Sequence, residues 1–162
     1  MPLTWGRHIR REEEHQMALS VSGEFEIEAT PEQVMAALVE VERIPEWSAV
    51  HKKVVVESRF DDGRPRTVRM TLAVLGVSDV QLAEHKWIGD ELMSWTLLES
   101  DKQKCQEGEY RLTPTARGTS VHLTMSVEPK VWVPKSVLRQ GQKQAVRLIR
   151  KGFTQFVLDN HV

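Results

Sequence analysis

The architecture of the chain is set by residues 134–158, which read PKSVLRQGQKQAVRLIRKGFTQFVL. Pro134 suits the first position of a helix, and apolar residues then recur at helical spacing as far as Leu158. The apolar stripe consists of Leu138, Ala145, Leu148, Ile149, Gly152, Phe153 and Phe156. The opposite side carries Arg139, Lys143, Arg147, Arg150 and Lys151. We therefore expect one long amphipathic helix that buries its stripe against another layer and exposes a basic face to solvent.

The chain before this helix is a succession of strands separated by tight turns. Asp61-Asp62-Gly63, Gly76-Val77 and Gly89-Asp90 are turn sequences, and residues 66–75 alternate between apolar and polar side chains. Connections this short make consecutive strands antiparallel. The predicted strands are 51–59, 66–75, 78–87, 91–99, 102–113 and 119–128.

A further strand, 19–28, comes first and leads into a helix. Thr30 can cap this helix, Pro31 suits its first position and Gln33 completes a capping box, so we expect it to run to about Val39. The next segment, 41–44, is expected to be a second short helical turn.

Pro45 is expected to break the chain there, because proline keeps the preceding residue out of the helical region. The order of elements predicts an α+β fold. It comprises a seven-stranded, curved antiparallel sheet that wraps around the long C-terminal helix, with two short helices between the first and second strands.

Composition excludes several classes of protein. The 162 residues correspond to one domain, and 22 Lys and Arg against 23 Asp and Glu give a net charge of −1. Such a chain has no overall attraction for nucleic acid, so we expect none as a partner. The lone Cys105 cannot form an internal disulfide or a thiolate metal cluster. No apolar run reaches the about 18 residues of a membrane span.

The N-terminal residues differ from the remainder. Residues 1–16 are charged and carry no sustained apolar period, so we expect a loosely ordered extension followed by one domain over 17–162. The extension lacks the apolar segment of a signal peptide, which predicts a cytoplasmic protein.

Hairpin register predicts which side chains of the strand 78–87 point inward. A two-residue loop at Gly76-Val77 would place Leu72 opposite Gln81 and Val74 opposite Asp79. A three-residue loop over 88–90 would then place His85 opposite Met93. The inward set becomes Asp79, Gln81, Ala83, His85 and Trp87, followed by Gln106, Gly108, Tyr110 and Leu112 on a later strand. Alternation within the strand alone gives the other reading, with Val80 and Leu82 inside.

Polar groups among apolar ones suggest an interior cavity, because a buried polar group without a partner costs about 1–3 kcal/mol. Gly141 and Gly152 lie on nearly one face of the final helix and are expected to leave room beneath it. Among the tryptophans, we expect Trp47 and Trp95 to line the cavity, and Trp87 and Trp132 to close the ends of the sheet.

The order of elements and several short motifs resemble the START-like, polyketide cyclase/dehydrase (SRPBCC) superfamily over about Ala18–Leu158. The motifs are Ala29-Thr30-Pro31-Glu32-Gln33-Val34, Pro45-Glu46-Trp47, Trp95-Thr96-Leu97, Leu112-Thr113-Pro114, Gly118-Thr119 and Val133-Pro134. The resemblance implies a helix-grip fold with an internal cavity. Its members bind lipids, sterols, polyketides or quinones; some are aromatase/cyclases, some are carriers, and one bacterial branch includes a toxin that acts on ribosome assembly. The family has no universal catalytic motif, so the resemblance implies no catalytic residue.

Catalytic and metal-binding signatures are absent from the sequence. No nucleophile elbow, phosphate-binding loop or metalloprotease motif is present, and no two histidines have metal-ligand spacing on one element. The best acid/base pair is Asp79 with His85, but six residues on one strand separate them by about 20 Å. They could contact two parts of one elongated ligand, or His85 could simply be solvated near the cavity mouth.

We therefore predict a protein that carries or senses a hydrophobic small molecule such as a lipid, polyketide or quinone, without a cofactor or metal. The predicted polar anchors are Asp79, Gln81, His85 and Gln106. The predicted walls are Trp47, Met70, Leu72, Trp95, Tyr110, Leu123, Leu148 and Phe153.

Two alternatives remain open. One is a polyketide cyclase/dehydratase with His85 as base. The other is a ribosome- or protein-binding regulator of a toxin–antitoxin pair that uses Arg147 and Arg150 on the basic helix face. A weak homodimer also remains open for this protein.

Overall fold

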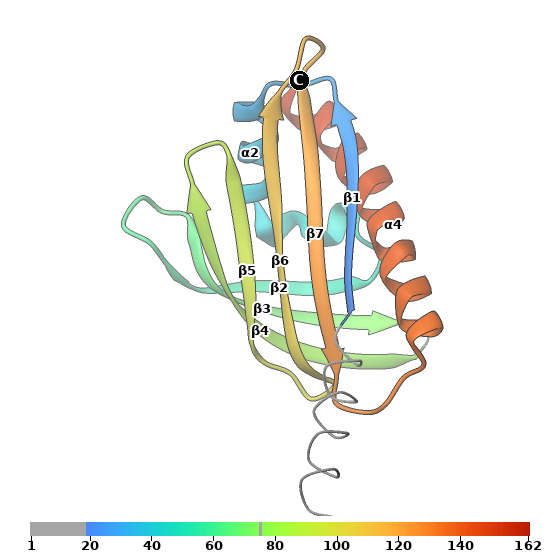
Figure 1. Cartoon of the computed structure of the whole chain (residues 1–162). Helices are drawn as coiled ribbons and strands as arrows, with labels where there is room; N and C mark the ends of the chain where they lie inside the picture. The colour runs from blue at the N-terminus through green and yellow to red at the C-terminus, as the bar shows by residue number, and fades with distance from the viewer. Residues whose placement is uncertain (1–18, 75) are drawn as a thin grey trace, which may run out of the picture.

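The computed structural model describes residues 19–74 and 76–162 and confirms the predicted architecture (Figure 1). The elements in chain order are β1 (Leu19–Ile27), α2 (Pro31–Val39), the 3₁₀ helix η1 (Val41–Arg43), α3 (Ile44–Trp47), β2 (His51–Arg59), β3 (Pro65–Val74), β4 (Val77–Ile88), β5 (Leu92–Glu99), β6 (Gln103–Pro114), β7 (Thr119–Pro129) and α4 (Lys135–His161). The predicted extension over residues 1–16 lies outside the described residues.

One antiparallel sheet contains all seven strands in the order β1-β7-β6-β5-β4-β3-β2. Since β1 and β2 form opposite edges, the chain crosses the sheet between them, and α2, η1 and α3 make this crossing. The sheet curves around α4, which lies beside β1 and packs against β1, α2 and α3 (Figure 1). This is the helix-grip fold.

The start of α2 follows the local sequence closely. The Gln33 amide donates to the Thr30 hydroxyl at 3.2 Å, and the Thr30 amide donates to the Gln33 side chain at 2.8 Å. The predicted capping box is thus confirmed. The predicted break at Pro45 is wrong, because Pro45 lies in the first turn of α3. Proline is tolerated there because the first-turn amides of a helix have no intrahelical partner.

Two glycines let α4 approach its neighbours closely. A Cβ atom on Gly23 would lie 2.5 Å from Cγ1 of Val146, and one on Gly152 would lie 2.1 Å from the carbonyl oxygen of Trp47. Gly152 was predicted to leave a cavity beneath α4. That prediction is wrong, because the backbone of α3 fills the space. Gly141 is exposed with no atom within 4 Å of a Cβ placed there, so that part of the cavity prediction is wrong too.

The buried stripe of α4 is displaced from the predicted one. It passes through Gln142, Phe153, Phe156 and Val157, with partly buried residues between them. Leu148 is 49% exposed and lies off this stripe. The prediction that it is a wall of the interior is therefore wrong. Helical spacing shows that several apolar residues share one side of the helix, but it does not show which of the outermost ones is exposed. Leu148 is one of these outermost residues.

The hairpins that flank β4 are each shifted from the predicted register. Leu72 pairs with Asp79 rather than with Gln81, and His85 pairs with Trp95 rather than with Met93. In each case the turn lies one residue from its predicted place, which changes every partner by two residues. Because side chains alternate with a period of two, such a shift leaves each side chain on its predicted face.

The inner face of the sheet, which packs toward the helices, is the predicted one. Gln81, Ala83 and His85 are buried, whereas Val80 is 44% exposed and Leu82 is only partly buried. The reading from hairpin register is confirmed, and the reading that places Val80 and Leu82 inside is wrong.

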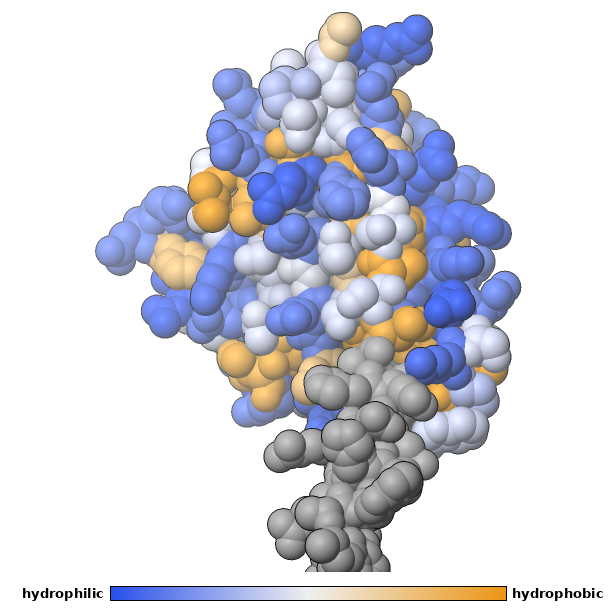
Figure 2. Space-filling model, viewed as in Figure 1, coloured by the Kyte–Doolittle hydropathy of each residue, from blue (hydrophilic) through white to orange (hydrophobic). Residues whose placement is uncertain are grey.

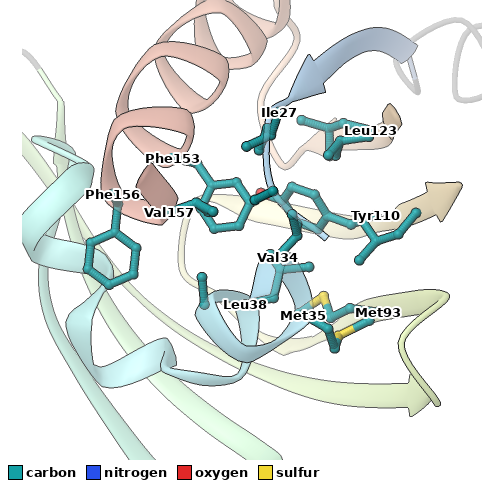
Figure 3. Close-up of a cluster of buried hydrophobic side chains, with 14 of the residues drawn as sticks. Ile27, Val34, Met35, Leu38, Met93, Tyr110, Leu123, Phe153, Phe156 and Val157 are labelled. Atoms are coloured by element: carbon teal, nitrogen blue, oxygen red, sulfur yellow. The ribbon is translucent and has the colours of Figure 1, made fainter. Parts of the chain in front are cut away.

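The main hydrophobic core lies where α2 and the second half of α4 meet the inner face (Figure 3). Its members include Ile27, Val34, Met35, Leu38, Met93, Tyr110, Leu123, Phe153, Phe156 and Val157. A smaller cluster of Val41, Val54 and Val68 secures η1 on β2 and β3. The opposite, outer face shows hydrophilic residues with separate apolar patches between them (Figure 2).

Candidate functional site

The inner face divides into a tightly packed part and a part that solvent reaches. Met93, Tyr110 and Leu112 are buried in the main core. Met70 and Leu72 on β3 also belong to the inner face but are only partly buried. Leu97 and Gln106 are likewise partly buried. Because α4 packs on β1, α2 and α3, some inner side chains of β3 and β5, such as Met70, Leu72 and Leu97, stay partly accessible.

A row of aromatic rings crosses the interior. The ring centroids of Trp95 and Tyr110 are 5.7 Å apart, those of Tyr110 and Phe153 6.2 Å, and those of Phe153 and Trp47 5.2 Å. All three pairs are tilted, which is a favourable geometry for aromatic side chains. The row joins β5, β6, α4 and α3, so the predicted residues Trp47, Trp95, Tyr110 and Phe153 are brought together.

Trp95 is held in one orientation by its neighbours on β6. Its indole Nε1 donates to the Gln106 side chain at 2.9 Å. A Cβ atom on Gly108 would lie 2.4 Å from the Trp95 ring, so this glycine leaves the space that the ring occupies. Gln106 in turn donates to Gln103 at 2.7 Å. These contacts position Trp95 between the packed core and the accessible part of the inner face.

His85 is the most deeply buried of the four predicted polar anchors. It is 2% exposed and lies beside Trp87, with ring centroids 6.0 Å apart. Its Nδ1 atom is buried and has no hydrogen-bond partner among the described residues. Burial lowers the pKa of His85 to about 4, because the imidazolium loses its hydration. The ring is therefore neutral at pH 7 and offers an unused polar atom to the interior.

Asp79 holds a turn in place. It accepts hydrogen bonds from the Gln81 side chain at 3.0 Å, the Ser100 hydroxyl at 2.6 Å and the Asp101 amide at 3.2 Å. Partial burial raises its pKa, but these hydrogen bonds and the charge of Lys102 outweigh burial, and the net pKa is lowered. Asp79 thus fastens β4 to the turn between β5 and β6, and Gln81 supports the Asp79 carboxylate.

The remaining predicted walls differ in their surroundings. Tyr110, Leu123 and Phe153 are members of the packed core, and burial raises the pKa of Tyr110 well above its usual value. Met70 and Leu72 lie on the accessible part of the inner face. Leu148 lies outside it.

Sequence reasoning missed three polar groups. His51 accepts or donates a 2.7 Å hydrogen bond with Ser48, and burial lowers its pKa to about 4. Gln142 is 4% exposed, donates to the Leu19 carbonyl at 2.7 Å and keeps its side-chain oxygen without a partner among the described residues. Trp47 Nε1 is also buried and unpaired there. The three-residue spacing of Ser48 and His51 could have predicted their hydrogen bond. Gln142 appears in the sequence only as a polar residue within the apolar stripe of the helix, which does not indicate its partner.

An open groove of about 360 Å³ lies outside this interior, between α3 and the end of α4. Its charged and amide side chains are already paired, because Glu46 binds Arg43, Asp159 accepts from Gln155, and Asn160 accepts from Arg43. Its charged side chains therefore offer no free group for specific recognition. Trp47 also lines the groove, but its Nε1 atom, unpaired among the described residues, is buried.

Residues 19–74 and 76–162 contain neither a metal-binding cluster nor a membrane-spanning helix. No group of three or more His, Cys, Asp or Glu side chains there could hold a metal ion. No helix there is long and apolar enough to cross a membrane.

Comparison with protein families identifies the chain. The model of the family described as "Polyketide cyclase / dehydrase and lipid transport" matches residues 18–157. The chain belongs to this family. The START-like resemblance noted from the sequence is thereby confirmed. A search of curated proteins found no match.

Several solved structures share the fold. A START superfamily protein from Mycobacterium smegmatis superposes with a TM-score of 0.78 at 21% identity, over 88% of this chain and 97% of that one. A protein from Thermus thermophilus gives 0.75 at 25% identity, over 89% and 100% of the two chains. The Zhui aromatase/cyclase from a Streptomyces species gives 0.75 at 13% identity, over 86% and 93%.

Proposed function

We propose that the protein binds a hydrophobic, uncharged small molecule against the inner face of β3 to β6, as a carrier or sensor. The family's description covers both lipid transport and cyclase chemistry, and either role requires such binding. The observation that carries the proposal is His85, a buried neutral ring whose Nδ1 lacks a partner among the described residues and which pairs across the sheet with Trp95 of the aromatic row. Burying that atom without a partner costs free energy that a bound ligand would recover.

The electrostatics of the inner face favour an uncharged ligand. His85 is neutral at pH 7, and the charge of Asp79 is already compensated by its hydrogen bonds to the turn. Of the buried polar side chains, Gln81, His85 and Gln142 are uncharged amide or imidazole groups. A charged ligand would lose its hydration here without an opposite charge to replace it. Flat aromatic molecules suit the rings of Trp95 and Tyr110.

Binding can be tested with Nile red, a neutral dye that fluoresces in apolar surroundings. We expect saturable uptake by the wild-type protein. Leu97→Trp adds bulk on the accessible inner face and should weaken binding at least about tenfold, or about 1.4 kcal/mol. Leu98→Trp is the matched control, because Leu98 is the next residue on β5 and is 50% exposed. Absence of saturable binding, or equal affinities for the two variants, would contradict the proposal.

The role of His85 can be tested with a pair of small aromatic ligands. We expect 2-naphthol, which has a hydroxyl, to bind more tightly than 2-methylnaphthalene, which has none. The preference should disappear in His85→Phe, because the variant retains the ring volume but removes Nδ1. A preference that survives this substitution would assign recognition of the hydroxyl to another residue.

The cyclase/dehydratase alternative rests on the same residue. A general base works best when its pKa lies near the working pH, and burial lowers that of His85 to about 4. This favours binding over proton abstraction, although the ring is unprotonated at pH 7. Dehydratase turnover that His85→Ala abolishes would reverse this preference. The regulator role of Arg147 and Arg150 remains a prediction, which reversal of both to Glu in a partner-binding assay would test.

A further inference from the structure

The connection from β7 to α4 exposes large apolar side chains to solvent. Val131 is 69% exposed, Trp132 73% and Val137 58%. Trp132 was expected to close the end of the sheet, and that expectation is wrong. By contrast, Trp87 and Trp95 are partly buried and donate hydrogen bonds through their indole nitrogens. An exposed apolar group of this size, with no contact to bury it among the described residues, indicates a surface that another body covers.

Positive charge is concentrated next to these side chains. Residues 129–158 contain no Asp or Glu, although the whole chain is slightly acidic. Lys135, Arg139, Lys143 and Arg147 follow one another at a spacing of four, so they share one face of α4. All four are exposed, and in the described part of the chain none of them forms an ion pair.

The basic face continues onto a neighbouring turn. The Lys130 amide donates to the Lys102 carbonyl at 3.1 Å, so the connection from β7 to α4 lies against the turn between β5 and β6. Lys102 and Lys130 are both exposed. The apolar tip of Val131 and Trp132 is therefore flanked by lysines on both sides.

We propose that Val131, Trp132 and Val137, with the basic face of α4, dock on a lipid membrane whose surface carries anionic headgroups. Tryptophan is enriched at membrane–water interfaces because its ring is apolar and its Nε1 is polar. Basic side chains beside it are attracted to anionic headgroups. An acidic protein would account for the basic face, but the exposed apolar tip matches the acyl boundary of a bilayer.

The full-length protein can be tested by flotation with vesicles. We expect binding to vesicles of phosphatidylcholine mixed with phosphatidylglycerol, weakening as salt is raised, and little binding to phosphatidylcholine alone. Trp132→Ser should reduce the fraction bound at least about fivefold, and Lys135→Glu with Arg139→Glu at least about tenfold. The matched controls are Ile88→Ser, which is 59% exposed at the end of β4, and Lys53→Glu with Arg117→Glu, both exposed and outside α4.

The controls should bind as the wild-type protein does, and circular dichroism should show every variant folded. Failure of the wild-type protein to bind mixed vesicles would overturn the proposal. So would charge reversal that abolishes binding while Trp132→Ser has no effect, particularly if poly-L-glutamate binds equally well. That result would identify a purely electrostatic surface for an acidic macromolecule. No outcome depends on the small-molecule ligand, so this proposal and the proposed function can fail separately.

Discussion

Gly152 on α4 lies so close to Trp47 on α3 that a Cβ atom there would come within 2.1 Å of the Trp47 carbonyl oxygen. A backbone carbonyl cannot move aside as a flexible side chain can, so any side chain at this position forces the two helices apart. The same contact places the Trp47 ring against Phe153, at one end of the aromatic row. The glycine thus determines where α3 sits on α4.

Gly152→Ala is therefore expected to destabilise the protein by about 1–3 kcal/mol, the usual cost of overpacking, despite alanine's higher helix propensity. Gly141→Ala is the matched control on the same helix, because no atom lies within 4 Å of a Cβ placed there. It should stabilise the protein by about 0.4–1 kcal/mol. Urea denaturation measures both changes, and the prediction fails if the two substitutions change stability in the same direction.

A second close contact sets the orientation of Trp95. A Cβ atom on Gly108 would lie 2.4 Å from the Trp95 ring and 2.7 Å from the Thr124 carbonyl oxygen. Gly108→Ala should therefore displace the ring, cost about 1–3 kcal/mol and weaken Nile red uptake. Glu107→Ala, an exposed neighbour on the same strand, should leave both measurements unchanged. Equal dye affinity in Gly108→Ala and the wild-type protein would show that Trp95 does not line the binding surface.

These contacts mark the limit of what the sequence predicts. The capping box of Thr30 and Gln33 joins residues three positions apart, and it was predicted correctly. Gly152 and Trp47 meet only through tertiary packing, so the sequence shows the glycine but not the carbonyl oxygen that requires it. The inferred cavity beneath that glycine was wrong for this reason.

The inner face was predicted correctly although its strand pairing was not. Leu72 was assigned to Gln81 but pairs with Asp79, a shift of two residues that preserves the side-chain direction. Turn sequences therefore predict the face of the sheet on which a side chain lies more reliably than its partner on the next strand.

The hydrogen bonds of Asp79 could not be predicted in this way, because they come from Ser100 and Asp101, beyond the next strand. Nothing in the sequence around Asp79 indicates that the turn would use this carboxylate.

Stability should fall as the pH is lowered from 7 to 4. Burial lowers the pKa values of His51 and His85 from 6.5 to about 4 in the folded protein. Between pH 6.5 and pH 4 the unfolded chain binds more protons than the folded one. The two histidines therefore contribute fully to the free energy of unfolding above about pH 6.5, and this contribution is lost as the pH falls toward about 4. His85→Met removes one of the two groups and should reduce the slope by up to about 1.4 kcal/mol per pH unit.

Urea unfolding at several pH values measures this slope. The exposed His122 provides the matched control, and His122→Met should retain the wild-type slope. A ligand that hydrogen-bonds to neutral His85 should bind more weakly as the ring becomes protonated below about pH 4. Parallel stability curves for the wild-type protein and His85→Met would show that His85 is not buried in its neutral form.

The turn between β5 and β6 should loosen when Asp79 is removed. Asp79→Ala leaves the Ser100 hydroxyl and the Asp101 amide without their shared acceptor, which should cost about 1–3 kcal/mol. Because the same turn contacts Lys130 through its backbone, the connection to α4 should also become more mobile. Hydrogen exchange should therefore accelerate at the amides of Asp101 and Lys130 but not within the core strand β7. Asp62→Ala, at the turn between β2 and β3, is the matched control, since its carboxylate also accepts a turn amide, that of Arg64, at 2.9 Å. Asp62→Ala should leave exchange at Asp101 unchanged. If Asp79→Ala also left it unchanged, the hydrogen bonds of Asp79 would not be what holds this turn against β4.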